Sequence, residues 1–156
     1  MHSEIEIAIK QYNSRYKEHL HTSYNTEINN PADFANALGY TIERITKSVL
    51  ICSTDRKKFA MAVCSVNKKF NFPELAKHMT CKKVEVASKE ELNQLVGYPV
   101  NGVCPIGLRD IPVFMDSTLL KFETVLVGGG VPKTEIEIYP SDLQKISEAT
   151  ILSILL

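Results

Sequence analysis

Two apolar runs in the middle of the chain constrain its fold more than any other feature. Residues 47–53 read KSVLICS and residues 58–66 read KFAMAVCSV. Continuous apolar runs with β-branched residues are typical of strands that are covered on both faces. The runs are separated by a polar turn that contains Asp55 and Arg56, so they are expected to pair as a hairpin. The fold should therefore contain a sheet with a covering layer on each side.

Helical and strand patterns alternate irregularly around this hairpin. Apolar residues recur at helical spacing near the N-terminus. Ser88 and Glu91 have the spacing of a capping box, which opens a helix. Helices are expected near residues 3–20, 31–38, 71–79, 88–96 and 141–146. Further strands are expected at residues 82–87, 111–116, 124–129 and 134–139, with a final apolar element at residues 149–155.

The length of the chain and this order of elements indicate one domain. Domains commonly contain about 100–200 residues. The chain has 156 residues, with no internal repeat, linker or low-complexity tract. Several strands are joined by hairpins and others are separated by helices. We therefore expect residues 1–156 to form a single α+β domain in which helices surround a mixed sheet.

The charge balance excludes one simple mode of nucleic-acid binding. Lysine plus arginine and aspartate plus glutamate each number 18, and the formal net charge is +0. A chain with this balance has no global basic excess that would attract RNA or DNA. Any contact with phosphate must therefore come from a local patch of basic residues.

The cysteines and the N-terminus favour a reducing compartment. The four cysteines are widely spaced, with no Cys-x-x-Cys pair, as expected of free thiols. The N-terminus carries Glu4 and Glu6 where a signal peptide would be basic. No segment approaches the roughly 20 apolar residues that span a membrane. The protein is therefore expected to be cytoplasmic, without a membrane partner.

Motifs for metals and cofactors are weak. His78 and Cys81 could share a helical face, but a zinc site needs three or four ligands and no second cluster lies near in sequence. The glycine run at residues 128–130 is followed by an apparent strand, whereas a dinucleotide fingerprint opens a helix. A tight turn is therefore the favoured interpretation of this run. No metal or cofactor is expected.

Lys47 differs from the other lysines of the chain. Lysine doublets at residues 57–58, 68–69 and 82–83 lie in or beside expected turns, which is the usual solvated pattern. Lys47 stands alone at the entry to the most apolar strand. Two interpretations remain open: a solvated lysine at a strand end, or an ammonium in a cleft that holds a phosphate or a developing oxyanion.

A long loop without periodicity covers residues 97–112 and contains glycines and three prolines. Such a loop in a small domain is more often functional than accidental. Cys104 lies within it and has two interpretations. It could be a nucleophile, but no histidine is obviously placed to hold its thiolate. The alternative, a small packing residue, is favoured.

The loop and the strand after it carry a family resemblance. Residues 96–116, VGYPVNGVCPIGLRDIPVFMD, resemble the YbaK/prolyl-tRNA synthetase-associated domain family. Residues 127–143 match the second pattern of the family, a glycine turn followed by a strand and a capped helix, and Lys47 matches its strand lysine. The resemblance covers about residues 36–150. The loop pattern of the family, a glycine-rich Ser/Cys-Pro sequence, then a glycine, then a strand ending in Asp, is matched by Gly102, Val103, Cys104, Pro105, Gly107 and Asp116.

The resemblance implies both a fold and an activity. Members of this family hydrolyse mischarged aminoacyl-tRNA, as inserts within prolyl-tRNA synthetases or as free-standing proteins. The implied fold is α+β with a strongly curved mixed sheet. The implied reaction is hydrolysis of the ester between an amino acid and the terminal adenosine of a prolyl-type tRNA. Aminoacyl-tRNA is the implied substrate, and a prolyl-tRNA synthetase is a further candidate partner. The alternatives are a binding module that lost the chemistry and a structural partner of a synthetase.

The resemblance also implies which residues act on the ester. The loop from Asn101 to Pro105, with Gly102, Val103 and Cys104 at its centre, would present backbone N–H groups to the ester carbonyl. Glycine permits this because it allows a close approach of the backbone. Lys47 would hold the phosphate of the terminal nucleotide or orient the reacting end.

Further residues are expected to bind the substrate around this centre. Gly129 and Gly130 would close the opposite wall, and Pro105 would border the loop. Asn101 replaces the first glycine of the family pattern, and Tyr98 stands where related free-standing members often have histidine. Both departures are expected to line the amino-acid pocket.

No protein group is convincingly placed as a general base. Asp116 ends an expected strand, and Asp142 lies in the first turn of an expected helix, where its charge suits the helix dipole. Both are therefore expected to be structural. The free hydroxyl beside the ester on the terminal ribose is expected to position or activate the water, so that the protein mainly orients the reacting groups.

Overall fold

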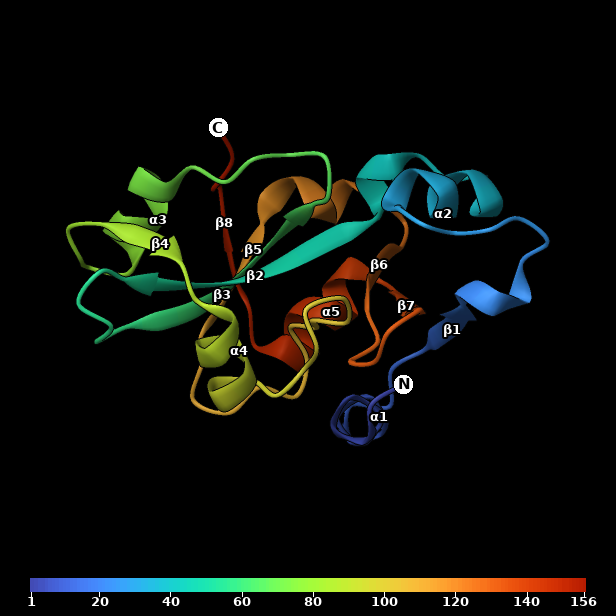
Figure 1. Cartoon of the computed structure of the whole chain (residues 1–156), viewed down its shortest axis with the longest axis horizontal. Coiled ribbons are helices and arrows are strands. Elements are labelled where there is room, and N and C mark those ends of the chain that lie inside the picture. The colour runs from blue at the N-terminus through green and yellow to red at the C-terminus, as the bar shows by residue number, and fades with distance from the viewer.

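The structure is a computed structural model that describes residues 1–156 (Figure 1). The helices are α1 (Ser3–Gln11), α2 (Pro31–Leu38), α3 (Phe72–His78), α4 (Lys89–Leu95) and α5 (Pro140–Ser147). The strands are β1 (Tyr16–Leu20), β2 (Thr46–Ser53), β3 (Phe59–Ser65), β4 (Val84–Val86), β5 (Val113–Asp116), β6 (Val125–Gly128), β7 (Thr134–Ile138) and β8 (Thr150–Leu152). Short 3₁₀ helices are η1 (His21–Ser23), η2 (Ile42–Arg44) and η3 (Ser117–Lys121).

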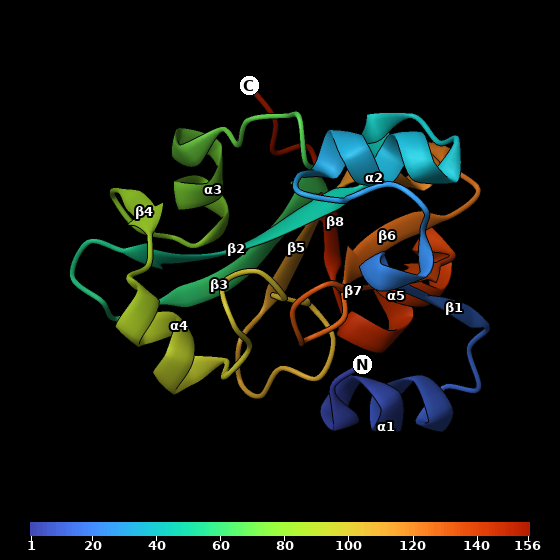
Figure 2. The same ribbon diagram turned by 45° about the vertical axis from the view of Figure 1, so that its right-hand side comes forward.

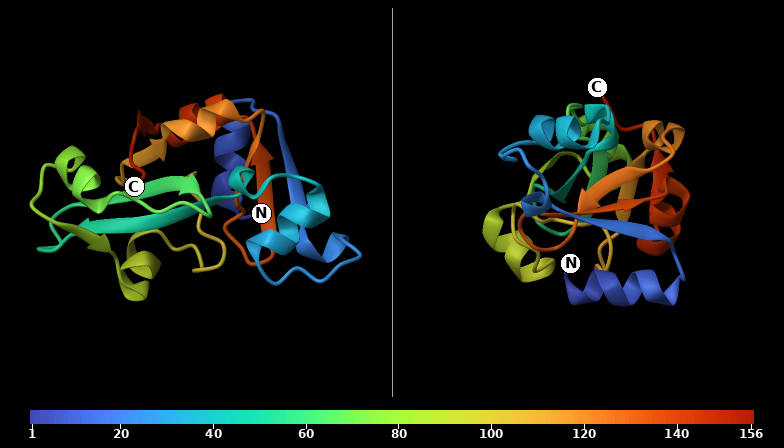
Figure 3. Two further views of the ribbon diagram at one scale, coloured as in Figure 1. Left: turned by 90° about the horizontal axis from the view of Figure 1, so that it is seen from above. Right: turned by 90° about the vertical axis from the view of Figure 1, so that its right-hand side faces the viewer.

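The strands form two sheets. The larger sheet has the order β4-β2-β3-β5-β8 and is mixed, because β2 is antiparallel to β3 and β4 whereas β5 is parallel to β3 and β8. The smaller sheet, β1-β7-β6, is antiparallel. One isolated bridge, Ile45 with Leu126, joins them. The α+β class with a mixed sheet is confirmed, and the expected curved sheet is divided at this bridge (Figure 3).

The predicted hairpin of β2 and β3 lies between two apolar clusters. Alternate side chains point to opposite faces of a strand. Leu50 and Met61 belong to a cluster with α1, α5 and the smaller sheet, whereas Ile51 and Ala62 belong to a second cluster with α3 and β4. The hairpin is therefore covered on both faces, as its continuous apolar runs predicted (Figure 2).

The expected helix at residues 3–20 is wrong beyond its first half. α1 ends at Gln11, and Asn13 takes a left-handed conformation with φ 50°. Residues 16–20 then form β1, which pairs with β7 from Tyr16 opposite Ile138 to Leu20 opposite Thr134. Asparagine tolerates this conformation better than most residues, so the chain can leave the helix there. Hydrogen bonds to a strand more than 100 residues away then determine the structure of the segment.

The final apolar element is β8, which lies parallel to β5 at the edge of the larger sheet. No helix of the structure is at once long enough and apolar enough to cross a membrane.

Candidate active site

The free edge of β2 and the glycine-containing loop form the borders of the candidate site. β4 pairs with β2 only at residues 51–53, so residues 46–50 have no strand on that side. The loop at residues 99–103 lies beside this open edge, next to the turn between β6 and β7 (Figure 2). A strand edge and a loop together leave backbone groups available to a ligand.

Two adjoining depressions lie along this edge and share Lys47, Ser48, Val100 and Val103. The first, here the apolar pocket, has a volume of about 350 Å³. Its remaining lining is Val49, Leu50, Val86, Ala87, Ser88, Lys89 and Leu92. The second, here the polar pocket, has a volume of about 260 Å³. Its remaining lining is Pro31, Thr46, Asn101, Gly102, Gly128 and Glu135.

Close backbone packing requires the two glycines of the polar pocket. A Cβ atom on Gly102 would lie 2.9 Å from backbone atoms of Val131. A Cβ atom on Gly128 would collide with the carbonyl oxygen of Val103. The Gly130 N–H donates to the Gly102 carbonyl at 2.8 Å and joins the loop to the β6–β7 turn. Glycine is therefore needed at both positions because two backbone segments meet there.

Gly129 and Gly130 are buried behind this wall and are not among the residues that line the polar pocket, so their contact with substrate stays a prediction. Gly129 faces Thr134, and Gly130 faces α1 through His2 and Ile5. Gly128 takes the position expected of them.

The loop offers several unpaired backbone donors. The Gly102 N–H donates to the Pro99 carbonyl at 2.9 Å and is therefore occupied. The N–H groups of Asn101, Val103 and Cys104 donate to no acceptor within the protein. Asn101 and Val103 also line the polar pocket. Backbone donors without internal partners are suited to hold a ligand oxygen.

Lys47 borders both pockets, but its ammonium turns away from the loop. Its Nζ atom lies 5.4 Å from the centroid of the Phe70 ring. Phe70 belongs to the apolar cluster covered by α3, whereas the loop packs on the other face of β2. Lys47 and the loop therefore line the same two pockets, whereas the strand alternation directs the Lys47 ammonium toward Phe70 and not toward the loop amides. A cation at this distance from an aromatic ring is in the range of a cation–π contact.

Ser48, the next residue along β2, is a site residue that the sequence pattern did not predict. It lines both pockets, and its hydroxyl oxygen is buried without a hydrogen-bond partner. A buried hydroxyl without a partner costs roughly 1–3 kcal/mol of stability. Such a group is unusual in a folded protein and is often explained by function. Its only signal in the sequence was its position beside Lys47.

Three further predicted site residues lie in the core. Tyr98 is 4% exposed, and its hydroxyl donates to the Ile106 carbonyl at 2.6 Å, which closes the loop. Pro105 lines neither pocket at the β2 edge. Cys104 is 0% exposed, and burial raises the pKa of its thiol to about 12. Tyr98 thus packs the loop, Pro105 borders a separate depression that α1 also lines, and the contact of both residues with substrate stays a prediction.

Thiol labelling tests the burial of Cys104. Cys52, Cys64 and Cys104 are buried, and only Cys81 is partly exposed. A thiolate is the reactive species, so a buried thiol whose pKa is raised reacts slowly. We expect iodoacetamide at pH 8 to modify the native protein at Cys81 alone, as read by peptide mass spectrometry. Rapid native labelling of Cys104 would contradict the packing role, and labelling in denaturant provides the control.

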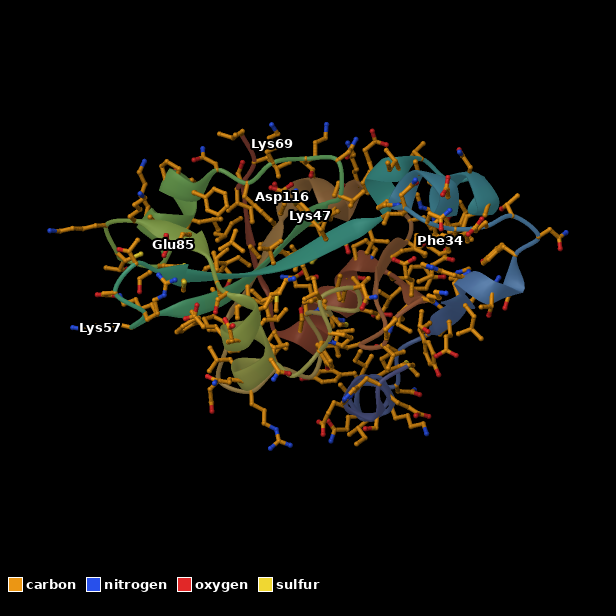
Figure 4. All side chains as sticks on the ribbon, in the orientation of Figure 1. Phe34, Lys47, Lys57, Lys69, Glu85 and Asp116 are labelled. Carbon is orange, nitrogen blue, oxygen red and sulfur yellow. The ribbon has the colours of Figure 1, made fainter.

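Asp116, one of the two carboxylates expected to be structural, has the contacts of a structural residue. Asp116 is 1% exposed and accepts hydrogen bonds from the backbone N–H groups of Thr118 and Ile154 (Figure 4).

Glu135 on β7 lines the polar pocket, and its Oε2 atom lies 2.9 Å from Nε2 of His21. Burial raises the pKa of Glu135, and the hydrogen bond from His21 opposes this shift. The two residues are 114 positions apart, so their proximity could not be predicted locally.

The fold and the site together define an α+β domain with a glycine-walled pocket on an open strand edge. Residues 26–146 match the aminoacyl-tRNA editing domain family. The chain belongs to this family. The family resemblance found in the sequence is thereby confirmed.

Individual relatives agree with this assignment. The chain is 32% identical over 105 residues to a proline–tRNA ligase of Sulfurihydrogenibium sp., which covers 67% of this chain but only 18% of the ligase. It is 24% identical over 140 residues to the "Putative Cys-tRNA(Pro)/Cys-tRNA(Cys) deacylase EbsC" of Enterococcus faecalis, covering 89% of this chain and 84% of that protein. A solved structure of "a putative trans-editing enzyme for prolyl tRNA synthetase" superposes with a TM-score of 0.81 at 20% identity, covering 98% of this chain and 95% of that one.

Proposed function

We propose that this protein hydrolyses the ester bond of mischarged aminoacyl-tRNA. The observation that carries the proposal is the pair of pockets on the β2 edge with the unpaired N–H group of Val103 at their shared wall. The aminoacyl side chain would enter the apolar pocket, and the terminal adenosine would lie in the polar pocket. The ester then falls between them, beside the loop.

The loop would stabilise the negative charge that develops on the ester carbonyl oxygen. Preorganised backbone donors are effective because they do not need to reorganise during the reaction, and each such donor contributes roughly 100-fold to 1000-fold in rate. The N–H groups of Asn101 and Val103 supply two candidates in the pocket wall. The Asn101 side chain is exposed at the mouth of the polar pocket, where it would limit the size of the substrate.

Lys47 and Ser48 would contact the substrate from the strand edge. Ser48 offers a hydroxyl without an internal partner at the junction of the pockets. Lys47 would reach a phosphate of the terminal nucleotide only after its side chain leaves Phe70. Lysine side chains have several rotatable bonds and act as point charges, so this rearrangement is physically accessible.

The lining of the apolar pocket indicates the class of amino acid removed. Val49, Leu50, Leu92, Val100 and Val103 contribute to it. An apolar wall favours an apolar side chain, because burying a charged group without a partner costs several kcal/mol. The presence of proline–tRNA ligases among the relatives supports a prolyl-type tRNA as the carrier and a prolyl-tRNA synthetase as a partner. The protein would act in the cytoplasm, and its 156 residues would form a single domain.

A deacylation screen tests this function directly. We expect prolyl-type tRNA charged with a small apolar amino acid to lose it at least about 100-fold faster with the protein than without it, a difference of roughly 2.7 kcal/mol in the barrier. The same tRNA charged with aspartate or lysine should be hydrolysed at the background rate. Release of acid-precipitable radiolabel measures both. Tight binding of the charged tRNA without turnover would instead support a binding module that lost the chemistry.

A further inference from the structure

Two histidine–glutamate pairs join the N-terminal segment to β7. His19 on β1 contacts Glu137 at 2.8 Å, and His21 in η1 contacts Glu135 at 2.9 Å. Glu135 and Glu137 are two residues apart on one strand, so their side chains project from the same face. The two pairs can therefore be compared with each other to distinguish a structural contact from a functional one.

The pair of His19 and Glu137 has the surroundings of a structural contact. Glu137 also accepts hydrogen bonds from Tyr40 at 3.0 Å and from Thr124 at 2.6 Å, and Arg44 lies 3.4 Å away. Burial raises the pKa of Glu137, but the hydrogen bonds from Thr124 and His19 outweigh it and the net shift is downward. Glu137 does not line either pocket at the β2 edge.

Glu135 differs from Glu137 in each of these respects. Its single hydrogen-bond partner is His21, which leaves its Oε1 atom without one. Its side chain is 18% exposed and lines the polar pocket together with Ser48, Asn101 and Val103. Burial raises its pKa, which is the direction that strengthens a carboxylate as a base. The His21 ring is fixed in turn against Phe34, with ring centroids 5.0 Å apart.

We propose that Glu135 is a catalytic residue that accepts the proton of the attacking water, and that His21 positions its carboxylate. The proposal rests on the deacylase function proposed above. The carboxylate takes one proton from water while the water oxygen bonds to the ester carbon. The bond from that carbon to the ribose oxygen then breaks, and the ribose oxygen recovers the proton from Glu135. The products are the free amino acid and a free terminal hydroxyl, and no co-reactant is consumed.

The N-terminal segment thereby completes the site. His21 lies outside residues 26–146, which match the family. The protein base that the sequence did not reveal is thus held by a residue that the family match does not include. The charged and titratable groups around the Glu135 carboxylate come from several elements of the fold. They are His21, His19, Tyr24, Glu137 and Lys47.

Glu135→Gln tests the catalytic role. Glutamine keeps the shape of the side chain and can still contact His21, but it cannot accept a proton. We expect the single-turnover rate at saturating protein to fall at least about 100-fold, within the range for loss of a general base. Affinity for an aminoacyl-adenosine analogue with an amide in place of the ester should change less than about threefold. Glu137→Gln is the matched control and should keep the rate of the wild type.

The pH dependence tests the positioning role of His21. A base works when deprotonated, so the rate of the wild type should fall as the pH drops through the pKa of Glu135. His21→Gln retains a donor but removes the imidazole, whose hydrogen bond and electrostatic interaction oppose the upward shift of the Glu135 pKa. The pKa of Glu135 should then rise, and the acidic limb of the rate profile should move to higher pH. A purely structural histidine would leave the limb in place.

The outcomes separate this proposal from the proposed function. An active wild type with an equally active, folded Glu135→Gln variant overturns the base and leaves the deacylase function intact. In that case a tRNA that ends in 2′-deoxyadenosine, if it binds and is not hydrolysed, assigns the activation to the neighbouring hydroxyl. A wild type that hydrolyses none of the charged tRNAs overturns both. Loss of rate in Glu137→Gln equal to that in Glu135→Gln also overturns the proposal, because both changes would then act through the fold.

Discussion

Gly128→Ala is expected to lower the rate of deacylation at least about 100-fold. The new methyl group would collide with the Val103 carbonyl oxygen and lie 3.0 Å from the Gly102 carbonyl carbon. Both contacts are to backbone, so the loop itself must move. A displacement of about 1 Å in a catalytic group can reduce a rate roughly 100-fold. Single-turnover deacylation with an apolar aminoacyl-tRNA measures the effect.

Gly39→Ala is the matched control for this substitution. Gly39 ends α2 with φ 71°, and an added Cβ would meet no atom within 4 Å. The left-handed conformation makes alanine there less stable by roughly 1–2 kcal/mol. We expect Gly39→Ala to lower the melting temperature and keep the rate. If Gly128→Ala retained the rate of the wild type, the loop position would not matter for the reaction.

Elements with local signals were predictable from the sequence. Both hydrogen bonds of the predicted capping box form between Ser88 and Glu91, and α4 begins there. Asn30 caps the start of α2, and Gly39 ends it in the left-handed conformation. In each case the determining contacts lie within a few residues, so the pattern contains the information. By contrast, β1 depends on pairing with β7, which no local pattern records.

The candidate site was predictable only in part, for the same reason. The family resemblance predicted the loop and the glycine turn, but strand alternation decided in which direction each neighbouring side chain points. Gly128 lines the polar pocket whereas Gly129 is buried, and Ser48 faces the loop whereas Lys47 extends toward Phe70. A difference of one residue along a strand reverses the face, so motif matching alone does not resolve it.

Ser48→Ala is expected to separate activity from stability. Its hydroxyl has no partner in the free protein, so removing it breaks no internal hydrogen bond. Burying an unpaired hydroxyl is unfavourable, and alanine removes this cost. The melting temperature should therefore stay the same or rise. If the hydroxyl contacts the substrate, the rate should fall about fivefold, since a hydrogen bond contributes roughly 1 kcal/mol.

Ser65→Ala provides the opposite case on the neighbouring strand. The Ser65 hydroxyl is buried and donates to the Glu43 carbonyl at 2.5 Å, away from both pockets. Its loss should lower the melting temperature by about 2–4 °C, as expected for roughly 1 kcal/mol in a chain of this size, and leave the rate unchanged. Thermal denaturation and single-turnover deacylation of the two variants should therefore give opposite patterns. A Ser48→Ala variant that is less stable and fully active would show that the hydroxyl supports the fold, and Ser48 would then have no part in binding the substrate.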